Sequence, residues 1–129
     1  MSNEYRKDSN IISWTNNLTA GSGTVAKGSL VHIGNGMFGV AVDAITFGAT
    51  GELIVRGYFT GGSAIINETL TVGKALFNSA TDIMVVTTLA SKSVTESGSA
   101  TVLIDMSNLR LAEDITASAS AQAFTYYLG

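Results

Sequence analysis

Three apolar segments separated by glycine-marked turns constrain the fold of this chain most strongly. They lie within residues 28–59, whose sequence is GSLVHIGNGMFGVAVDAITFGATGELIVRGYF. The Asn-Gly pair after the first segment stands between two apolar runs, which is a strong short-range signal for a β-hairpin. Residues 29–33 and 37–42 are therefore predicted to form the strands of a hairpin, and residues 52–59 are predicted to form a third strand.

The remaining segments also favour β-structure. The chain has 14 glycines and no proline, so its tight turns must be made by Gly, Asn, Asp and Ser. Residues 74–78 and 83–87 are predicted to form a further hairpin, and residues 101–106 a closing strand. The sequence shows no internal repeat of fixed period. We therefore predict an all-β fold, a small antiparallel β-barrel or β-sandwich.

Both ends of the chain are predicted to extend from this core as arms. A chain of 129 residues has room for one domain, and we place its β-rich core at residues 19–108. Residues 1–18 are predicted to form an N-terminal arm and residues 109–129 a C-terminal arm. A short helix at the start of the last segment is the alternative to a simple arm there.

Apolar side chains on these predicted arms are candidate partner-binding residues, because aromatic anchors on polar segments suit contacts with another subunit. The alternative for the N-terminal set is a first strand that docks on the core. The alternative for the C-terminal set is packing on the chain's own core. The candidates are Ile11, Ile12 and Trp14 at one end and Phe124, Tyr126 and Tyr127 at the other.

The low share of charged residues is typical of a protein that packs against others. Charged residues make up 13% of the chain, with a formal net charge of -3, whereas about a quarter is usual. The chain has no stripe of basic residues that could neutralise phosphates, which argues against nucleic acid as a partner. The apolar runs are too short to span a membrane, and the start MSNEYRKDSN lacks a signal-peptide pattern. We expect no membrane partner and synthesis in the cytoplasm.

The sequence offers no catalytic constellation. His32 is the single histidine and lies inside a predicted strand, so we interpret it as a structural residue that faces solvent or a neighbouring segment. There are no cysteines, and the acidic residues are scattered without a glycosidase pair or a calcium-binding cluster. We therefore expect no catalytic residue, no cofactor, no metal site and no enzymatic activity.

A series of glycine and small apolar motifs runs through the central stretch and beyond it. The motifs are Leu30-Val31, Gly39-Val40-Ala41, Gly51-Glu52, Gly57-Tyr58-Phe59 and the later KALFN segment at residues 74–78. In this order and spacing, the chain resembles a family of small tailed-phage head proteins that are described as capsid cement or decoration proteins. The resemblance covers roughly residues 24–106.

The resemblance implies a function and a set of partners. Such a protein lies on the outer capsid surface of the virion, after synthesis in the host cytoplasm, and binds the major capsid protein. It stabilises contacts between capsid subunits without catalysis. The resemblance also implies a homo-oligomer, with a trimer favoured over a dimer, in which the apolar residues of the arms contact the capsid or a neighbouring subunit.

A second hypothesis is a phage tail, fibre or adhesin-like structural component that binds surface glycans. Glycan binding favours exposed aromatic side chains in an open, polar setting. Tyr58 and Phe59, which lie close to Gly61 and Gly62, are the candidate platform for such a contact.

Overall fold

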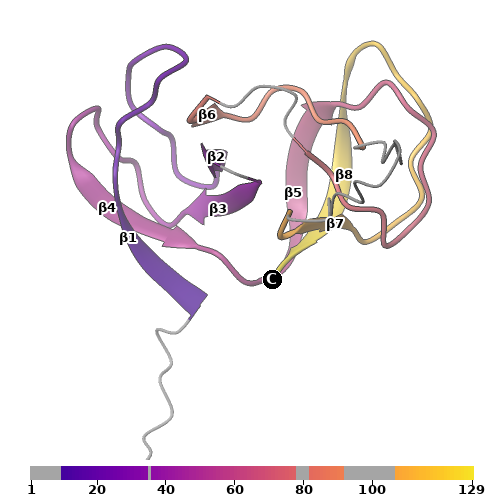
Figure 1. Ribbon diagram of the computed structural model, residues 1–129, viewed down its shortest axis with the longest axis horizontal. Coiled ribbons are helices and arrows are strands. Elements are labelled where there is room, and N and C mark those ends of the chain that lie inside the picture. Colours follow the sequence, from indigo (N-terminus) through magenta and orange to yellow (C-terminus); the bar gives the residue numbers. More distant parts are fainter. Residues whose placement is uncertain (1–9, 35, 78–81, 92–106) are drawn as a thin grey trace, which may run out of the picture.

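The protein is built from two antiparallel β-sheets that lie side by side (Figure 1). A computed structural model describes residues 10–34, 36–77, 82–91 and 107–129. No α-helix occurs in these ranges, and none of the described segments could cross a membrane as a helix. The predicted all-β class is therefore confirmed, in a sandwich-like form in which the barrel is not closed. The strands are β1 (Ile11–Thr15), β2 (Leu30–Gly34), β3 (Met37–Ala41), β4 (Thr50–Ile54), β5 (Gly57–Ile65), β6 (Met84–Val85), β7 (Leu109–Leu111) and β8 (Ala121–Leu128).

The predicted central hairpin lies inside the larger sheet. This sheet has five strands in the order β1-β4-β3-β2-β6. β2 and β3 pair antiparallel, with Val31 opposite Gly39, as the Asn-Gly signal predicted. β1 lies at one edge and pairs with β4 along its whole length. The alternative that Ile11, Ile12 and Trp14 belong to a first strand is thus confirmed.

The C-terminal segment is part of the second sheet, whereas the sequence analysis predicted an arm. This sheet has three strands in the order β5-β8-β7. β8 lies in its centre and pairs with β5 from Ala121 to Leu128 and with β7 from Tyr126 to Leu128. Every second side chain of β8 from Phe124 onwards is buried, which is the alternation of a strand with one covered face. The prediction of a C-terminal arm at residues 109–129 is therefore wrong, because these residues contain β7 and β8 of the second sheet.

Two other predicted elements differ from the structure. The single strand predicted over residues 52–59 is divided, because β4 ends at Ile54 in one sheet and β5 begins at Gly57 in the other. The predicted pairing of residues 74–78 with 83–87 is also wrong, since β6 pairs with β2 instead. Local patterning could not separate these cases, because both depend on which distant strand each segment meets. The strand predicted over 101–106 lies outside the described residues.

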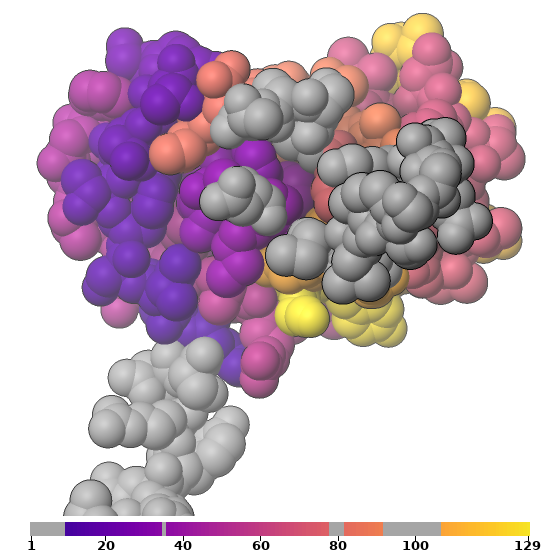
Figure 2. All heavy atoms as spheres, viewed as in Figure 1, coloured from indigo at the N-terminus to yellow at the C-terminus, as the bar shows by residue number. Residues whose placement is uncertain are grey.

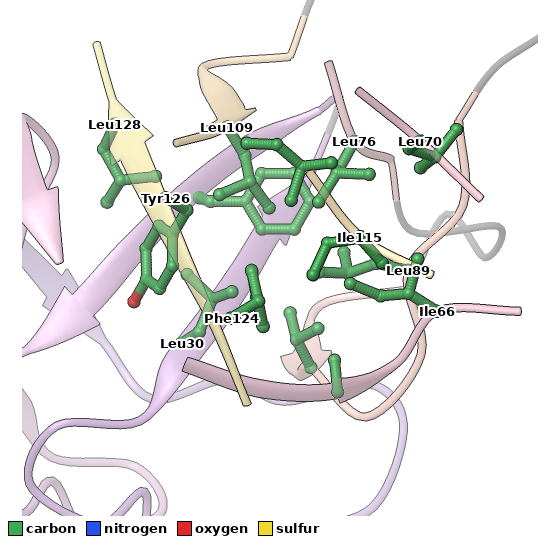
Figure 3. Close-up of a cluster of buried hydrophobic side chains, with 14 of the residues drawn as sticks. Leu30, Ile66, Leu70, Leu76, Leu89, Leu109, Ile115, Phe124, Tyr126 and Leu128 are labelled. Atoms are coloured by element: carbon green, nitrogen blue, oxygen red, sulfur yellow. The ribbon is translucent and has the colours of Figure 1, made fainter. Parts of the chain in front are cut away.

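The β2–β3 hairpin separates two hydrophobic cores. On one side lies the N-terminal core, which consists of Val25, Val31, Ala41, Ile45 and Leu53. On the other side lies the larger C-terminal core, which is shown in Figure 3. Leu30, Phe38 and Val40 of the hairpin are members of the C-terminal core, while Val31 and Ala41 are members of the N-terminal core. Because side chains alternate along a strand, this hairpin is buried on both faces.

The two sheets follow the same plan, which defines two repeat units. The N-terminal unit comprises residues 10–55 and has the strand order β1-β4-β3-β2. The C-terminal unit comprises residues 57–77 and 107–129 and has the order β5-β8-β7, which the segment around Ala75 extends by pairing with Arg110 of β7. In each unit the first strand pairs antiparallel with the last. Figure 2 shows the indigo and purple atoms of the first unit on one side and most of the yellow atoms of the second on the other.

Equivalent backbone hydrogen bonds support this correspondence. In each unit a bridge residue is followed three positions later by a glycine at positive φ, Gly28 (82°) and Gly73 (89°), a conformation that glycine adopts without strain. Four N–H to O=C bonds of the N-terminal unit have a match in the C-terminal unit. In the N-terminal unit they are Val25 to Ile45 (2.9 Å), Gly28 to Ala41 (2.8 Å), Ala41 to Ser29 (3.0 Å) and Val42 to Glu52 (3.1 Å). Their matches in the C-terminal unit are, in the same order, Leu70 to Ile115 (2.8 Å), Gly73 to Leu111 (2.8 Å), Leu111 to Lys74 (3.0 Å) and Ala112 to Thr125 (3.0 Å).

The side chains of the two cores also correspond. The strand registers align Ala41 opposite Leu53 in one unit with Leu111 opposite Tyr126 in the other. Each buried residue of the N-terminal core thereby has a buried counterpart in the C-terminal core. The corresponding pairs are Val25 and Leu70, Val31 and Leu76, Ala41 and Leu111, Ile45 and Ile115, and Leu53 and Tyr126. The chain thus contains a repeat of architecture that its sequence does not show.

Candidate interaction surface

The single histidine has a structural role. His32 is buried in β2, and the N–H of Gly36 donates to its Nε2 at 3.2 Å. Nε2 is therefore the acceptor, and Nδ1 carries the proton that it donates to the carbonyl oxygen of Asp82 at 2.7 Å. The ring also packs against Phe38, with a centroid separation of 5.0 Å. Both ring nitrogens are used within the fold, so neither is directed at a substrate or a metal.

Two of the described carboxylates likewise serve the fold. Glu68 accepts hydrogen bonds from the N–H and the hydroxyl of Ser91, at 2.8 and 2.7 Å. Glu113 accepts from the N–H and the hydroxyl of Thr125, at 2.7 and 2.9 Å. Within the described part of the chain, no group of three or more His, Cys, Asp and Glu residues could hold a metal ion.

Two of the six candidate partner-binding residues lie in the core. Phe124 and Tyr126 project from β8 into the C-terminal core, as Figure 3 shows, and are 1% and 2% exposed. Their rings contact each other at 5.1 Å, and Tyr126 also stacks on Phe59 at 5.2 Å. Burial raises the pKa of Tyr126 from 10.0 to about 12, because the ionised phenolate loses its hydration. Neither side chain can reach a partner in this fold, which confirms their alternative as core residues.

Tyr127 points to the opposite face of the same strand and is exposed. It forms a cross-strand pair with Tyr58 of β5, and the two ring centroids are 5.2 Å apart. Tyr58 is 55% exposed and Tyr127 is 50% exposed. On its other side Tyr127 is in register with Arg110 of β7, which in turn pairs with Ala75. We call these four residues the tyrosine row.

The tyrosine row joins Tyr127 to Tyr58, a partner that no local sequence pattern indicates. The sequence predicts Tyr58 and Phe59 together as a platform for glycans, but successive residues of a strand face opposite sides. Phe59 packs against the C-terminal core, so the two rings do not form one surface. The alternation of Phe124, Tyr126 and Leu128 in the sequence could have separated the buried face of β8 from Tyr127. The pairing of Tyr58 with Tyr127 depends on a contact between distant segments.

β1 provides a second exposed feature, the edge of the five-stranded sheet. Ile12 and Trp14 are partly buried against the N-terminal core, and Ile11 is partly exposed on the other face. Within the described residues, β1 pairs only with β4, so its outer edge has no strand beside it. The backbone donors and acceptors on such an edge can pair with a strand from another chain.

Comparison with known families identifies the class of this protein. A family model described as phage cement protein matches residues 8–109, which is more than half of the chain. The chain belongs to the phage cement protein family, and the predicted resemblance is confirmed. This membership indicates a structural role in a phage capsid. Neither the curated proteins nor the solved structures include a match.

The matched range has a position in the fold that bears on the two surfaces. It includes the whole of β1 and also Tyr58, but it ends at Leu109, the first residue of β7. Tyr127 and the rest of β8 lie beyond it. The edge of β1 is therefore within the part of the chain that matches the family, whereas the tyrosine row is only partly within it.

Proposed function

We propose that this protein binds the outer surface of an assembled phage capsid and stabilises contacts between major capsid subunits without catalysis. The observation that carries the proposal is the family match over residues 8–109. The composition agrees with it, because only 13% of the residues are charged and a protein that packs against a shell needs less charge on its surface. An all-β fold with few charged side chains suits a protein that binds its partner without catalysis.

The outer edge of β1 is the contact that we propose for the capsid. The N–H of Val55 donates to Asn10 O, and the N–H of Asn16 donates to Ala49 O. Backbone groups alternate in direction along an antiparallel strand, so the even-numbered residues of this strand bond to β4. The backbone groups of Ser13 and Thr15 then point outward. A strand or extended arm of a capsid subunit could add to this edge by main-chain hydrogen bonds.

Cosedimentation with purified undecorated capsids tests this proposal. Ser13→Pro removes one outward N–H while keeping the bonds to β4, because proline is tolerated on an edge strand. We expect the Ser13→Pro variant to bind shells at least tenfold more weakly, since main-chain pairing supplies the affinity in strand addition. The matched control is Ser13→Ala, which keeps the N–H and is expected to bind like the unmodified protein.

The possible results separate the function from the contact. Failure of the unmodified protein to sediment with shells would refute capsid binding and favour the tail, fibre or adhesin alternative, which a glycan array then tests. Equal binding by the proline and alanine variants would retain the capsid function and reject the edge of β1 as the contact. Thermal unfolding of both variants checks that the sheet is intact.

A further inference from the structure

The tyrosine row has a counterpart in the N-terminal unit. Equivalent registers place four residues directly opposite one another across four neighbouring segments in each unit. In the C-terminal unit these are Tyr58, Tyr127, Arg110 and Ala75, in the order of the segments. In the N-terminal unit the equivalent residues, which we call the aliphatic row, are Ile11, Ile54, Val40 and Leu30.

The aliphatic row shows what this face of a repeat unit packs against. Its two inner members, Val40 and Leu30, are only 6% and 9% exposed and are members of the C-terminal core. The C-terminal unit therefore covers the outer face of the N-terminal unit. Figure 3 shows Leu30 among the side chains of that core, near Phe124 and Tyr126. The outer face of one unit is thus a surface on which another unit of the same fold packs.

The corresponding face of the C-terminal unit has no such cover from the described residues. Tyr58 and Tyr127 are half exposed, and Arg110 is exposed. The guanidinium of Arg110 donates to Gly73 O at 3.2 Å. Tyr and Arg are enriched at the centre of interfaces between proteins that also exist separately. Their polar ends tolerate water, while their apolar parts can be buried by a partner.

We propose that the tyrosine row binds a second copy of this chain. The repeat supports a second copy over other partners, because the equivalent face of the N-terminal unit already packs against a unit of this same fold. The replacement of aliphatic by tyrosine and arginine side chains suits a face that is exposed in one copy and covered in an assembly. Because this proposal rests on the repeat and not on the family's function, it is independent of the proposed capsid contact.

Light scattering of the purified full chain, measured over a series of concentrations, tests the inference. The unmodified protein is expected to exceed the mass of one chain, 13.4 kDa, and to do so increasingly with concentration. The double variant Tyr58→Ser, Tyr127→Ser is expected to remain at the mass of one chain. Tyr127→Lys is a second variant, which places like charges near Arg110 and is expected to weaken association at least tenfold. Phe47→Ser is the matched control, because Phe47 is 48% exposed in a turn of the other unit.

Three results would overturn the inference. One is an unmodified protein that keeps the mass of one chain at every concentration. Another is a double variant that associates as well as the unmodified protein while unfolding at a similar temperature. The third is a loss of capsid binding by the double variant when the free unmodified protein is monomeric, because the tyrosine row would then be a capsid contact. Capsid binding that persists in a monomeric double variant would support both proposals separately.

Discussion

The N-terminal and C-terminal units share a backbone plan and differ in how large side chains are distributed over it. At one cross-strand position the first unit has Trp14 opposite Gly51, and the second has Gly62 opposite Phe124. The large residue has moved from the first strand of the unit to the last. A Cβ atom on Gly62 would lie 2.7 Å from the ring of Tyr126 and 2.8 Å from the ring of Phe124. The space for one aromatic side chain is therefore conserved in the architecture while its source changes.

This exchange explains why the two apolar ends of the chain have different environments. Both ends were predicted to be arms with anchoring aromatic residues. Trp14 lies on an edge strand and is only partly buried against the smaller core, while Phe124 lies on a central strand and is fully buried in the larger one. Whether an aromatic side chain is buried thus depends both on the position of its strand in the sheet and on the face of the strand that carries it, since Tyr127 on the same central strand is exposed.

The largest effect expected from this comparison is that of truncating the two aromatic side chains. Phe124→Ala is expected to lower the free energy of unfolding by about 3–5 kcal/mol, because it leaves a cavity in a packed core. Trp14→Ala is expected to lower it by about 1–2 kcal/mol, since part of that side chain is already exposed. Urea unfolding of both variants measures the difference. Equal losses would show that the two cores support the fold to the same extent.

A smaller effect is expected from equivalent substitutions in the two outer rows. Val40→Ser is expected to cost about 2–3 kcal/mol of unfolding free energy, because it removes apolar contacts and buries a hydroxyl. Arg110→Ser, at the corresponding position, is expected to cost below about 1 kcal/mol, as exposed charged residues contribute little. Chemical denaturation at low protein concentration isolates the effect on one chain. A similar cost for both would contradict the assignment of one row as covered and the other as exposed.

The smallest effect is a dependence of stability on pH. At one pair of equivalent core positions the N-terminal unit has Leu53, which cannot ionise, and the C-terminal unit has Tyr126, which can. The unfolded chain ionises this tyrosine at a pKa near 10.0, and the folded chain at a pKa of about 12. The unfolded state therefore loses the proton first, and stability falls as pH rises between these values. Tyr126→Phe is expected to reduce that alkaline loss. Denaturation midpoints of the unmodified protein and of Tyr126→Phe, measured below and above pH 10, test this loss. If both midpoints fall equally as pH rises, Tyr126 is not the source of the loss.

The sequence was sufficient for features that depend on neighbouring residues. The Asn-Gly signal correctly located the β2–β3 hairpin, and the motifs around Gly39-Val40-Ala41 correctly indicated the family. The absence of partners around His32 correctly indicated a structural histidine. None of these features required knowing which distant strands pair.

The remaining features depend on contacts between distant segments. The repeat is hidden because equivalent positions carry different residues, such as Leu53 and Tyr126 in the cores or Val40 and Arg110 in the outer rows. The tyrosine row joins Tyr58 to Tyr127 across the sheet, and no local pattern specifies that register. For β8, however, the alternating burial from Phe124 to Leu128 could have been inferred from the sequence, since a period of two is typical of a half-covered strand.

The position of the β2–β3 hairpin has a consequence for how the molecule resists stress. Because this hairpin supplies side chains to both cores, neither half can lose its packing without exposing the other. Local openings that spare one half are then costly, and the amides of β2 and β3 should exchange with solvent only when the whole chain unfolds. The two halves are therefore expected to unfold together, so that neither half opens at a stress lower than the one that unfolds the whole molecule.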